Sequence, residues 1–169
     1  VSPTGGEPVP VTSVDTGVNS FRWSPDGTRI LFESSRNGDS QLWVIHLHGG
    51  EAKQLTTISS GASNGTWSPD GKQIVFSSDR DASRNSDYDI FVMNADGSNP
   101  QNLTKNQAKN QYPDWSPDGK QIAFYSDRDG DGFAIWVMAA DGSQQARLTP
   151  KAIPGSNPCW LPARSVGTR

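Results

Sequence analysis

Three aspartates at alternate positions are the first residues whose spacing suggests a binding chemistry. Asp127, Asp129 and Asp131 are followed by Gly132, which gives the Asp-x-Asp-x-Asp-Gly beginning of a calcium loop. Hard cations prefer such alternating carboxylates on a tight glycine turn. The glutamate expected later in a calcium loop is replaced by Met138, and the flanks favour strands, so an ordinary turn is the competing interpretation. Calcium is the one cofactor that the sequence suggests.

Two further patterns match a catalytic motif or the spacing of metal ligands. Residues 61–65 match Gly-x-Ser-x-Gly, but this motif needs a preceding strand, a following helix and a downstream histidine. Both histidines, His46 and His48, lie upstream. Their spacing of two would place them on one side of a strand, yet no third metal ligand accompanies them. We therefore predict no catalytic residues and no enzymatic activity.

The elements that position these residues come from an internal repeat. Trp-Ser-Pro-Asp-Gly begins at Trp23, Trp67 and Trp115, and a decayed copy begins at Trp160. The tryptophans are 44, 48 and 45 residues apart. A period of this size is typical of β-propeller blades.

Each repeat predicts four antiparallel strands. Proline and glycine in the common motif favour a tight turn, and short runs rich in β-branched and aromatic residues follow at 30–32, 74–76 and 122–124. Third strands are expected at 42–45, 90–93 and 135–138, and last strands end in Leu-Thr at 55–56, 103–104 and 148–149. The prediction is an all-β fold with three complete blades, at about residues 19–56, 63–104 and 111–149.

The two ends of the sequence match incomplete blades. Residues 1–14 resemble the last strand of a preceding blade, and residues 156–169 resemble the first strand of a following one. The whole chain, 1–169, is therefore expected to be one propeller segment, either a partial propeller or half of an oligomeric ring. Its open blade faces predict a homo-oligomer.

Composition excludes several classes of partner. The net charge is −3 and no basic cluster occurs, which excludes nucleic acid. No apolar run is long enough for membrane insertion, and the N-terminus has no signal-peptide pattern. Cys159 is the one cysteine, so it forms no internal disulfide.

Comparison of the repeats separates constant parts from variable ones. The number of residues from each repeat tryptophan to the following arginine (Arg36, Arg80 or Arg128) is constant. This fixed position predicts that the arginines have a structural role and pair with aspartates. The next loop varies in length and shares a face with the connections between blades, as binding loops do. Neutral variation of solvated loops is the alternative. The predicted protein-binding residues on this face are Asp81, Arg84, Asp87, Tyr88, Asp89, Asp129, Asp131 and Phe133. The inner strands are expected to place small and polar residues near a central channel, namely Ser20, Asn64, Asp114 and Asn157.

The repeat resembles that of the TolB family of β-propellers. The match is best over residues 67–104 and 115–149, where Trp-Ser-Pro-Asp-Gly-Lys-Gln-Ile is followed by Phe-x-Ser-Asp-Arg and Ala-Asp-Gly-Ser. The resemblance implies a six-bladed propeller fold and a non-enzymatic protein- or peptide-binding module. It also implies a periplasmic or extracellular location and, by similarity to the Tol-Pal envelope system, a Pal-like lipoprotein as partner. Two alternatives are the propeller of a prolyl-oligopeptidase-type or other hydrolase without its catalytic domain, and a self-assembling structural segment.

Overall fold

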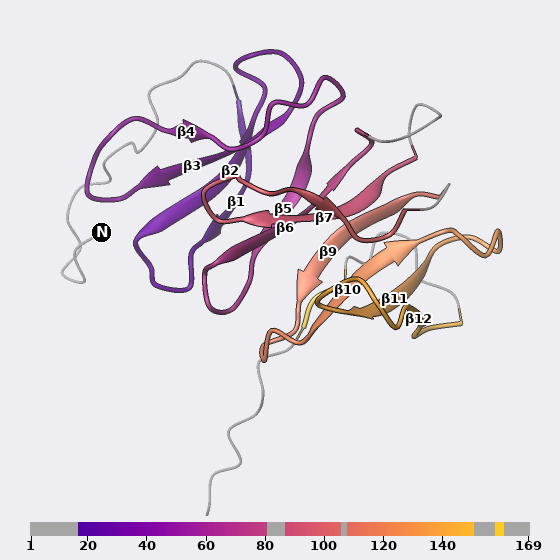
Figure 1. Cartoon of the computed structure of the whole chain (residues 1–169). Coiled ribbons are helices and arrows are strands. Elements are labelled where there is room, and N and C mark those ends of the chain that lie inside the picture. The colour runs from indigo at the N-terminus through magenta and orange to yellow at the C-terminus, as the bar shows by residue number, and fades with distance from the viewer. Residues whose placement is uncertain (1–16, 81–86, 106–107, 151–157, 161–169) are drawn as a thin grey trace, which may run out of the picture.

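The chain folds into three four-stranded antiparallel sheets that follow one another in an arc (Figure 1). The computed structural model describes residues 17–80, 87–105, 108–150 and 158–160. Within these residues there is no helix. The predicted all-β fold with blades of four antiparallel strands is confirmed.

Each sheet is built from strands in chain order. The first sheet contains β1 (Val18–Trp23), β2 (Arg29–Ser34), β3 (Gln41–His46) and β4 (Lys53–Gln54). The second contains β5 (Ser63–Trp67), β6 (Gln73–Ser78), β7 (Asp89–Asn94) and β8 (Gln101–Asn102). The third contains β9 (Asn110–Trp115), β10 (Gln121–Ser126), β11 (Ala134–Ala139) and β12 (Ala146–Arg147). The blade limits given above stay a prediction, because residues 1–14 and most of 156–169 lie outside the described residues.

The repeated motif forms the turn between the first two strands of each sheet. In the first sheet, Gly27 donates its N–H to the Ser24 carbonyl at 2.9 Å, and Ser24 Oγ accepts the Arg29 N–H at 2.9 Å. Gly27 has a φ of +67°, a conformation that favours glycine. The Asp26 carboxylate accepts the N–H of Thr28 at 3.0 Å. The motif is therefore a self-contained turn.

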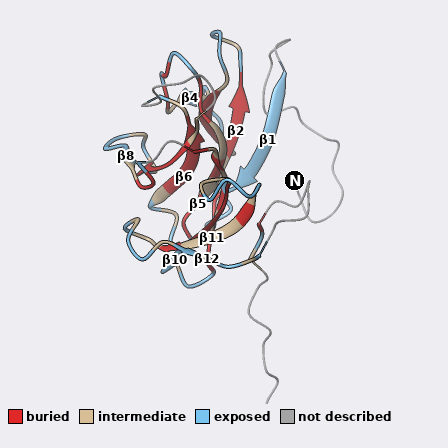
Figure 2. Cartoon of the chain, turned by 90° about the vertical axis from the view of Figure 1, so that its right-hand side faces the viewer, coloured by how far each residue is buried: buried red, intermediate tan, exposed pale blue. Residues whose placement is uncertain are grey.

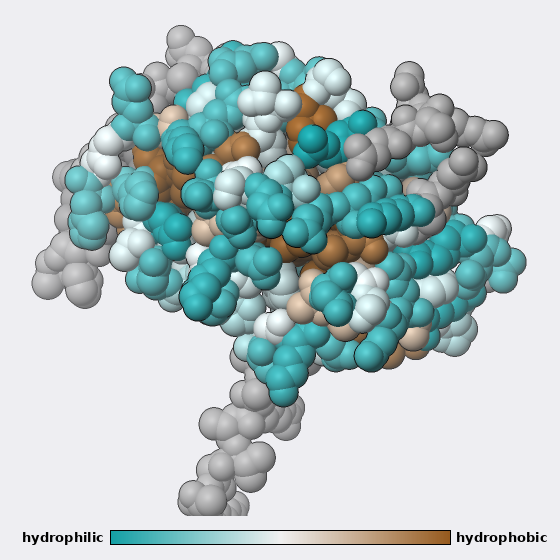
Figure 3. Space-filling model, in the orientation of Figure 1, coloured by the Kyte–Doolittle hydropathy of each residue, from teal (hydrophilic) through white to brown (hydrophobic). Residues whose placement is uncertain are grey.

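Apolar side chains fill the spaces between neighbouring sheets. Leu31 and Leu42 of the first sheet pack against Trp67 and Phe76 of the second. Val75 and Ile90, on the other face of the second sheet, belong to a core with Trp115 and Phe124 of the third. Figure 3 shows hydrophobic residues in brown, visible only in patches between hydrophilic surface residues. Each sheet thus relies on its neighbour to bury one of its faces.

Within the described residues, the first sheet has one strand, β1, that no neighbouring element covers. All six residues of β1 are exposed, as the pale blue strand in Figure 2 shows. Trp23 is 51% exposed, whereas the equivalent Trp67 and Trp115 are 7% and 5% exposed. Large apolar exposure of this kind marks an open edge of the arc.

The inner strands contain an irregularity at the same position in each repeat. Ser20, Asn64 and Tyr112 have φ values of +44°, +56° and +54°, although none is glycine. Each lies three residues before the tryptophan of its repeat, where the pairing register with the second strand shifts. These are β-bulges, which commonly redirect side chains next to binding sites.

Candidate functional site

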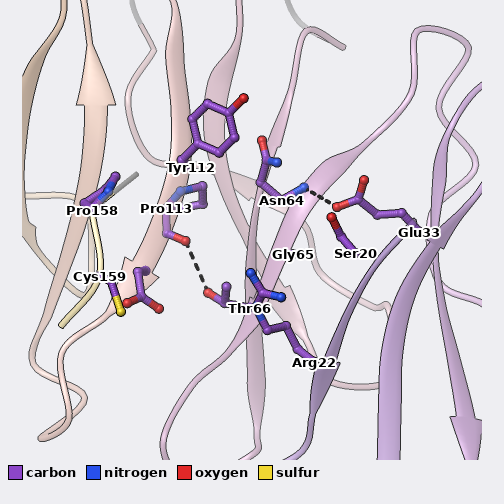
Figure 4. Close-up of a pocket in the computed structure, with 11 residues that line it drawn as sticks. Ser20, Arg22, Glu33, Asn64, Gly65, Thr66, Tyr112, Pro113, Pro158 and Cys159 are labelled. Atoms are coloured by element: carbon purple, nitrogen blue, oxygen red, sulfur yellow. Dashed lines mark hydrogen bonds between the residues drawn. The ribbon is translucent and has the colours of Figure 1, made fainter. Parts of the chain in front are cut away.

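A pocket of about 250 Å³ lies where the inner strands β1, β5 and β9 meet. In Figure 4, Glu33 lies on one side of Asn64 and Gly65, and Tyr112 and Pro113 lie on the other. All three sheets therefore contribute to one cavity. Its lining residues are Ser20, Arg22, Glu33, Asn64, Gly65, Thr66, Tyr112, Pro113, Asp114, Pro158 and Cys159.

Glu33 is a buried carboxylate on the wall formed by the first sheet. It is 8% exposed, and its Oε1 accepts the backbone N–H of Asn64 at 2.7 Å. Burial raises the pKa of Glu33, while the Asn64 hydrogen bond and the charge of Arg22 act in the opposite direction. The bulge at Asn64 thus supplies the donor that fixes this carboxylate at the pocket.

Asp114 is the corresponding carboxylate on the wall formed by the third sheet. Its Oδ2 accepts the backbone N–H of Trp160 at 3.1 Å. Burial raises the pKa of Asp114, and the Trp160 hydrogen bond and Arg22 oppose that change. Two partly desolvated acids from different sheets therefore line the same cavity.

Arg22 is the one cationic side chain among the lining residues that the structure describes. Its Nη1 donates to the Phe21 carbonyl at 2.9 Å. It forms no ion pair within 4.0 Å with any described carboxylate, including Glu33 and Asp114. With two carboxylates and one guanidinium, the described lining has a net negative charge when all three are ionised.

Aromatic rings connect the pocket with the loop after β10. Tyr112, which lines the pocket, meets Tyr125 edge-on at a centroid distance of 6.4 Å. Tyr125 in turn packs against Phe133 at 5.7 Å. Phe133 was predicted from sequence to belong to the binding face, so this predicted face and the pocket share a packed aromatic contact.

The sequence of nearly the whole chain matches one family model. The TolB beta propeller domain matches residues 4–85 and again residues 82–166. The chain belongs to the TolB β-propeller family. No curated protein matched the chain in a sequence search.

Solved TolB structures share the fold of this TolB-family chain. A protein of Agrobacterium tumefaciens assigned to TolB is 32% identical, with a TM-score of 0.70, over 82% of this chain and 50% of that one. TolB of Acinetobacter baumannii is 26% identical, with a TM-score of 0.64, over 83% of this chain and 33% of that one. The chain thus spans half of the first and a third of the second.

Prolyl endopeptidases also share the propeller fold. One such structure is 20% identical, with a TM-score of 0.61, over 82% of this chain and 22% of that chain. This likeness concerns the fold alone. Among the described residues of the TolB-family chain, no helix is long and apolar enough to cross a membrane.

The strand register places the variable loops and the blade connections at the same edge. Ser34, at the end of β2, pairs with Val18 at the start of β1 and with Gln41 at the start of β3. Ser126 pairs in the same way with Asn110 and Ala134. This common edge of the TolB-type blades agrees with the geometry expected from sequence.

The predicted face residues differ in their surroundings. Asp87 and Tyr88 are half-buried, and Asp129 and Asp131 are exposed. Asp89 is 8% exposed, and its carboxylate accepts hydrogen bonds from Thr104 Oγ1 at 2.5 Å and Asn102 Nδ2 at 2.8 Å. Asp89 is therefore engaged inside the second sheet. Asp81 and Arg84 lie outside the described residues, and binding through this face stays a prediction.

The structure does not bring the three aspartates of the predicted calcium loop together. Asp127 Oδ1 accepts the backbone N–H of Lys109 at 2.8 Å, and Asp129 forms a 3.0 Å ion pair with Arg147. Within the described parts of the chain, no group of three or more His, Cys, Asp or Glu side chains is placed to hold a metal ion. The geometry gives calcium binding no support.

Two of the repeated arginines, Arg36 and Arg128, do not make the predicted pair with an aspartate. Arg36 stacks on Trp43 at 4.5 Å and on Phe32 at 5.3 Å, and Arg128 stacks on Trp136 at 4.5 Å. Neither Arg36 nor Arg128 forms an ion pair within 4.0 Å with a described carboxylate. Cation–π stacking and hydrogen bonds hold these two side chains. Arg36 donates to Ser34, and Arg128 donates to Ser126, Gln145 and Asn110.

Sequence reasoning found part of the pocket and missed the rest. Ser20, Asn64 and Asp114 were expected near the channel and do line the pocket, and Asn157 lies outside the described residues. Arg22, Glu33 and Tyr112 were missed. Their signal was present, because each stands at a position of the inner two strands where the three repeats carry different residue types.

Proposed function

We propose that this chain is a non-enzymatic propeller module that binds a protein or peptide at its inner strands and along the adjoining loop face. The pocket carries the proposal. The residue before the repeat tryptophan is Arg22, Thr66 or Asp114, although the turn that follows is identical in all three repeats. A constant frame that presents different chemistry from each repeat is suited to recognition of an irregular ligand.

The polar groups of the pocket favour binding over catalysis. Serine and threonine hydroxyls are present at Ser20 and Thr66, but no histidine or lysine lies among the described lining residues to act as their base. Thr66 Oγ1 instead donates to the Pro113 carbonyl at 3.3 Å. These contacts are consistent with positioning and hydrogen bonding of a ligand.

By family resemblance, we propose a Pal-like lipoprotein as the partner and the periplasm as the location. The test is capture of a Pal-like lipoprotein from envelope extract by the immobilised chain, compared with Asp114→Asn and with Glu51→Gln as an exposed control. Specific capture that Asp114→Asn weakens and Glu51→Gln leaves unchanged supports the proposal. Equal capture by all three chains rules out the pocket, and no capture rules out this partner.

Two alternative functions have specific support. The prolyl endopeptidase fold likeness favours a propeller that accompanies a catalytic domain, which co-purification with a peptidase activity would support. The exposed β1 strand favours self-association of copies, which a discrete oligomer in light scattering would support. Self-association through β1 would compete with ligand binding, because Ser20 and Arg22 of this strand also line the pocket.

A further inference from the structure

We infer that the pocket binds the charged end of a basic side chain, lysine or arginine, from an extended peptide, and holds it between Glu33 and Asp114. This inference rests on the proposed peptide-binding function and specifies the chemistry of the ligand. It depends on three features of the cavity. Two carboxylates are incompletely hydrogen-bonded, the Arg22 guanidinium forms no ion pair with either of them, and an aromatic side chain forms part of the wall.

The two carboxylates each accept fewer hydrogen bonds than a carboxylate has capacity for. Glu33 Oε1 accepts from Asn64 and Asp114 Oδ2 accepts from Trp160, both through backbone N–H groups. Glu33 accepts no other hydrogen bond from the described residues, and the Asp114 carboxylate has one further backbone contact, with the N–H of Trp115. An ionised carboxylate has capacity for several donors, and a partly buried one is costly without them. An ammonium or guanidinium group supplies both the missing donors and the missing charge.

The rigidity of these acceptors favours a specific fit. Each carboxylate is held by the backbone of a neighbouring inner strand or segment, so its position is fixed before a ligand arrives. Glu33 comes from β2 and Asp114 from β9, with Asn64, Gly65 and Thr66 of β5 between them. Preorganised acceptors on two walls reduce the entropy lost when a cation binds.

Arg22 does not replace the ligand cation. Its guanidinium donates to the carbonyl of Phe21, the preceding residue, and lies beyond ion-pair distance of both carboxylates. Its charge nevertheless acts on both acids and lowers their pKa values, against the larger effect of burial. Arg22 therefore weakens the attraction of the pocket for a second cation, and its removal should strengthen binding.

The wall beside Asp114 suits the apolar stem of a basic side chain. Tyr112 is 37% exposed at the pocket, and Tyr125 and Phe133 pack behind it. Long basic side chains bind with their methylene stem on apolar surface and their charge on an acceptor, and an aromatic face also attracts the cation.

The test uses two blocked pentapeptides, acetyl-Gly-Gly-Lys-Gly-Gly-amide and the same peptide with norleucine in place of lysine. Binding is measured by NMR titration of the whole chain. The lysine peptide should bind at least about tenfold more tightly, because norleucine keeps the stem and lacks the charge. Glu33→Gln and Asp114→Asn should each weaken lysine-peptide binding about tenfold, and Arg22→Gln should strengthen it severalfold.

The control variant is Glu51→Gln, at an exposed residue outside the pocket. It makes the same Glu-to-Gln change and should leave peptide binding unchanged. NMR spectra of each variant verify that the fold is intact. Equal affinity for both peptides, or weaker binding by Arg22→Gln, overturns this inference and leaves the peptide-binding function standing. If neither peptide binds, the inference is overturned, and the envelope capture experiment decides the proposed function separately.

Discussion

The indole nitrogen of Trp67 donates a hydrogen bond of 3.3 Å to the backbone carbonyl of Arg22 in the preceding sheet. Trp160 makes the equivalent contact with the Asp114 carbonyl at 3.1 Å. In both cases the acceptor is the residue before the tryptophan of the previous repeat, and its side chain lines the pocket. At these two junctions the contact that joins neighbouring repeats therefore also fixes a residue of the candidate site.

The Trp67 hydrogen bond should contribute measurably to stability. Trp67→Phe keeps a large ring and removes the indole donor, so we expect a loss of about 1 kcal/mol for the lost hydrogen bond, beyond any packing change. Trp23→Phe is the matched control, since Trp23 is 51% exposed and belongs to the same motif. Urea unfolding of the two variants makes the comparison. Equal losses at both sites would show that the inter-sheet contact has no energetic role.

A glycine turn in the second sheet should tolerate no side chain. Gly97 has a φ of +91°, and an added Cβ would lie 2.8 Å from the Leu55 carbonyl oxygen of the first sheet. Gly97→Ala combines this clash with backbone strain, so the loss should exceed the roughly 1–2 kcal/mol of a left-handed alanine alone. Gly49→Ala, at φ +106° with nothing within 4 Å, carries only the strain. Thermal unfolding that gives the same loss for both would contradict the close approach of Gly97 to Leu55.

The buried acid Glu33 should lower stability at neutral pH. Its pKa is raised in the folded state above its ordinary value of 4.5, so its favourable contribution is complete below that value and is lost as pH rises through the folded pKa. Glu33→Gln keeps an acceptor for Asn64 and cannot ionise. We expect its free energy of unfolding to exceed that of the parent at pH 7 and the gap to close below about pH 4.5. If denaturant unfolding gives a difference in unfolding free energy between Glu33→Gln and the parent that does not change with pH, this account is refuted.

The turn aspartate Asp118 should have the opposite pH dependence. Hydrogen bonds from Ser116 Oγ at 2.7 Å and Lys120 N–H at 3.1 Å hold its pKa below the ordinary 3.8. Its stabilisation is thus present above that value and is lost as pH falls through the folded pKa. Asp118→Asn should be slightly less stable than the parent at pH 7 and equal to it in strong acid. Asp131→Asn is the exposed control, and an identical acid unfolding curve for both variants would speak against the turn contacts.

The open edges of the arc should drive self-association. Phe21, Trp23 and Leu148 are 61%, 51% and 62% exposed, a large apolar surface for a chain of this size. We expect a discrete oligomer by light scattering at micromolar concentration. A combined Phe21→Ser and Trp23→Gln variant should shift the population towards monomer. A parent chain that stays monomeric throughout this range would exclude self-association by these faces.

The repeated turns and apolar strands were predictable because their causes are local. Proline, aspartate and glycine at fixed offsets determine the turn around Gly27, and alternating β-branched and aromatic residues determine the strand pattern. The stacking of Arg36 on Trp43 was not predictable, because only the pairing of β2 with β3 brings the two side chains together, and the aromatic ring offers an alternative to aspartate. The dispersal of Asp127 and Asp129 towards Lys109 and Arg147 is likewise decided by neighbours in space.

The sequence alone determined the family, the all-β blade and the positions at which the repeats differ, since all of these follow from self-similarity at a fixed period. Tertiary structure decided which of those positions share a cavity. Glu33, Asn64 and Asp114 belong to three different repeats, and they meet because each sheet buries its apolar face on the next and turns its inner strand to the same side. The burial that makes Glu33 and Asp114 hard to ionise exists only once the sheets have packed.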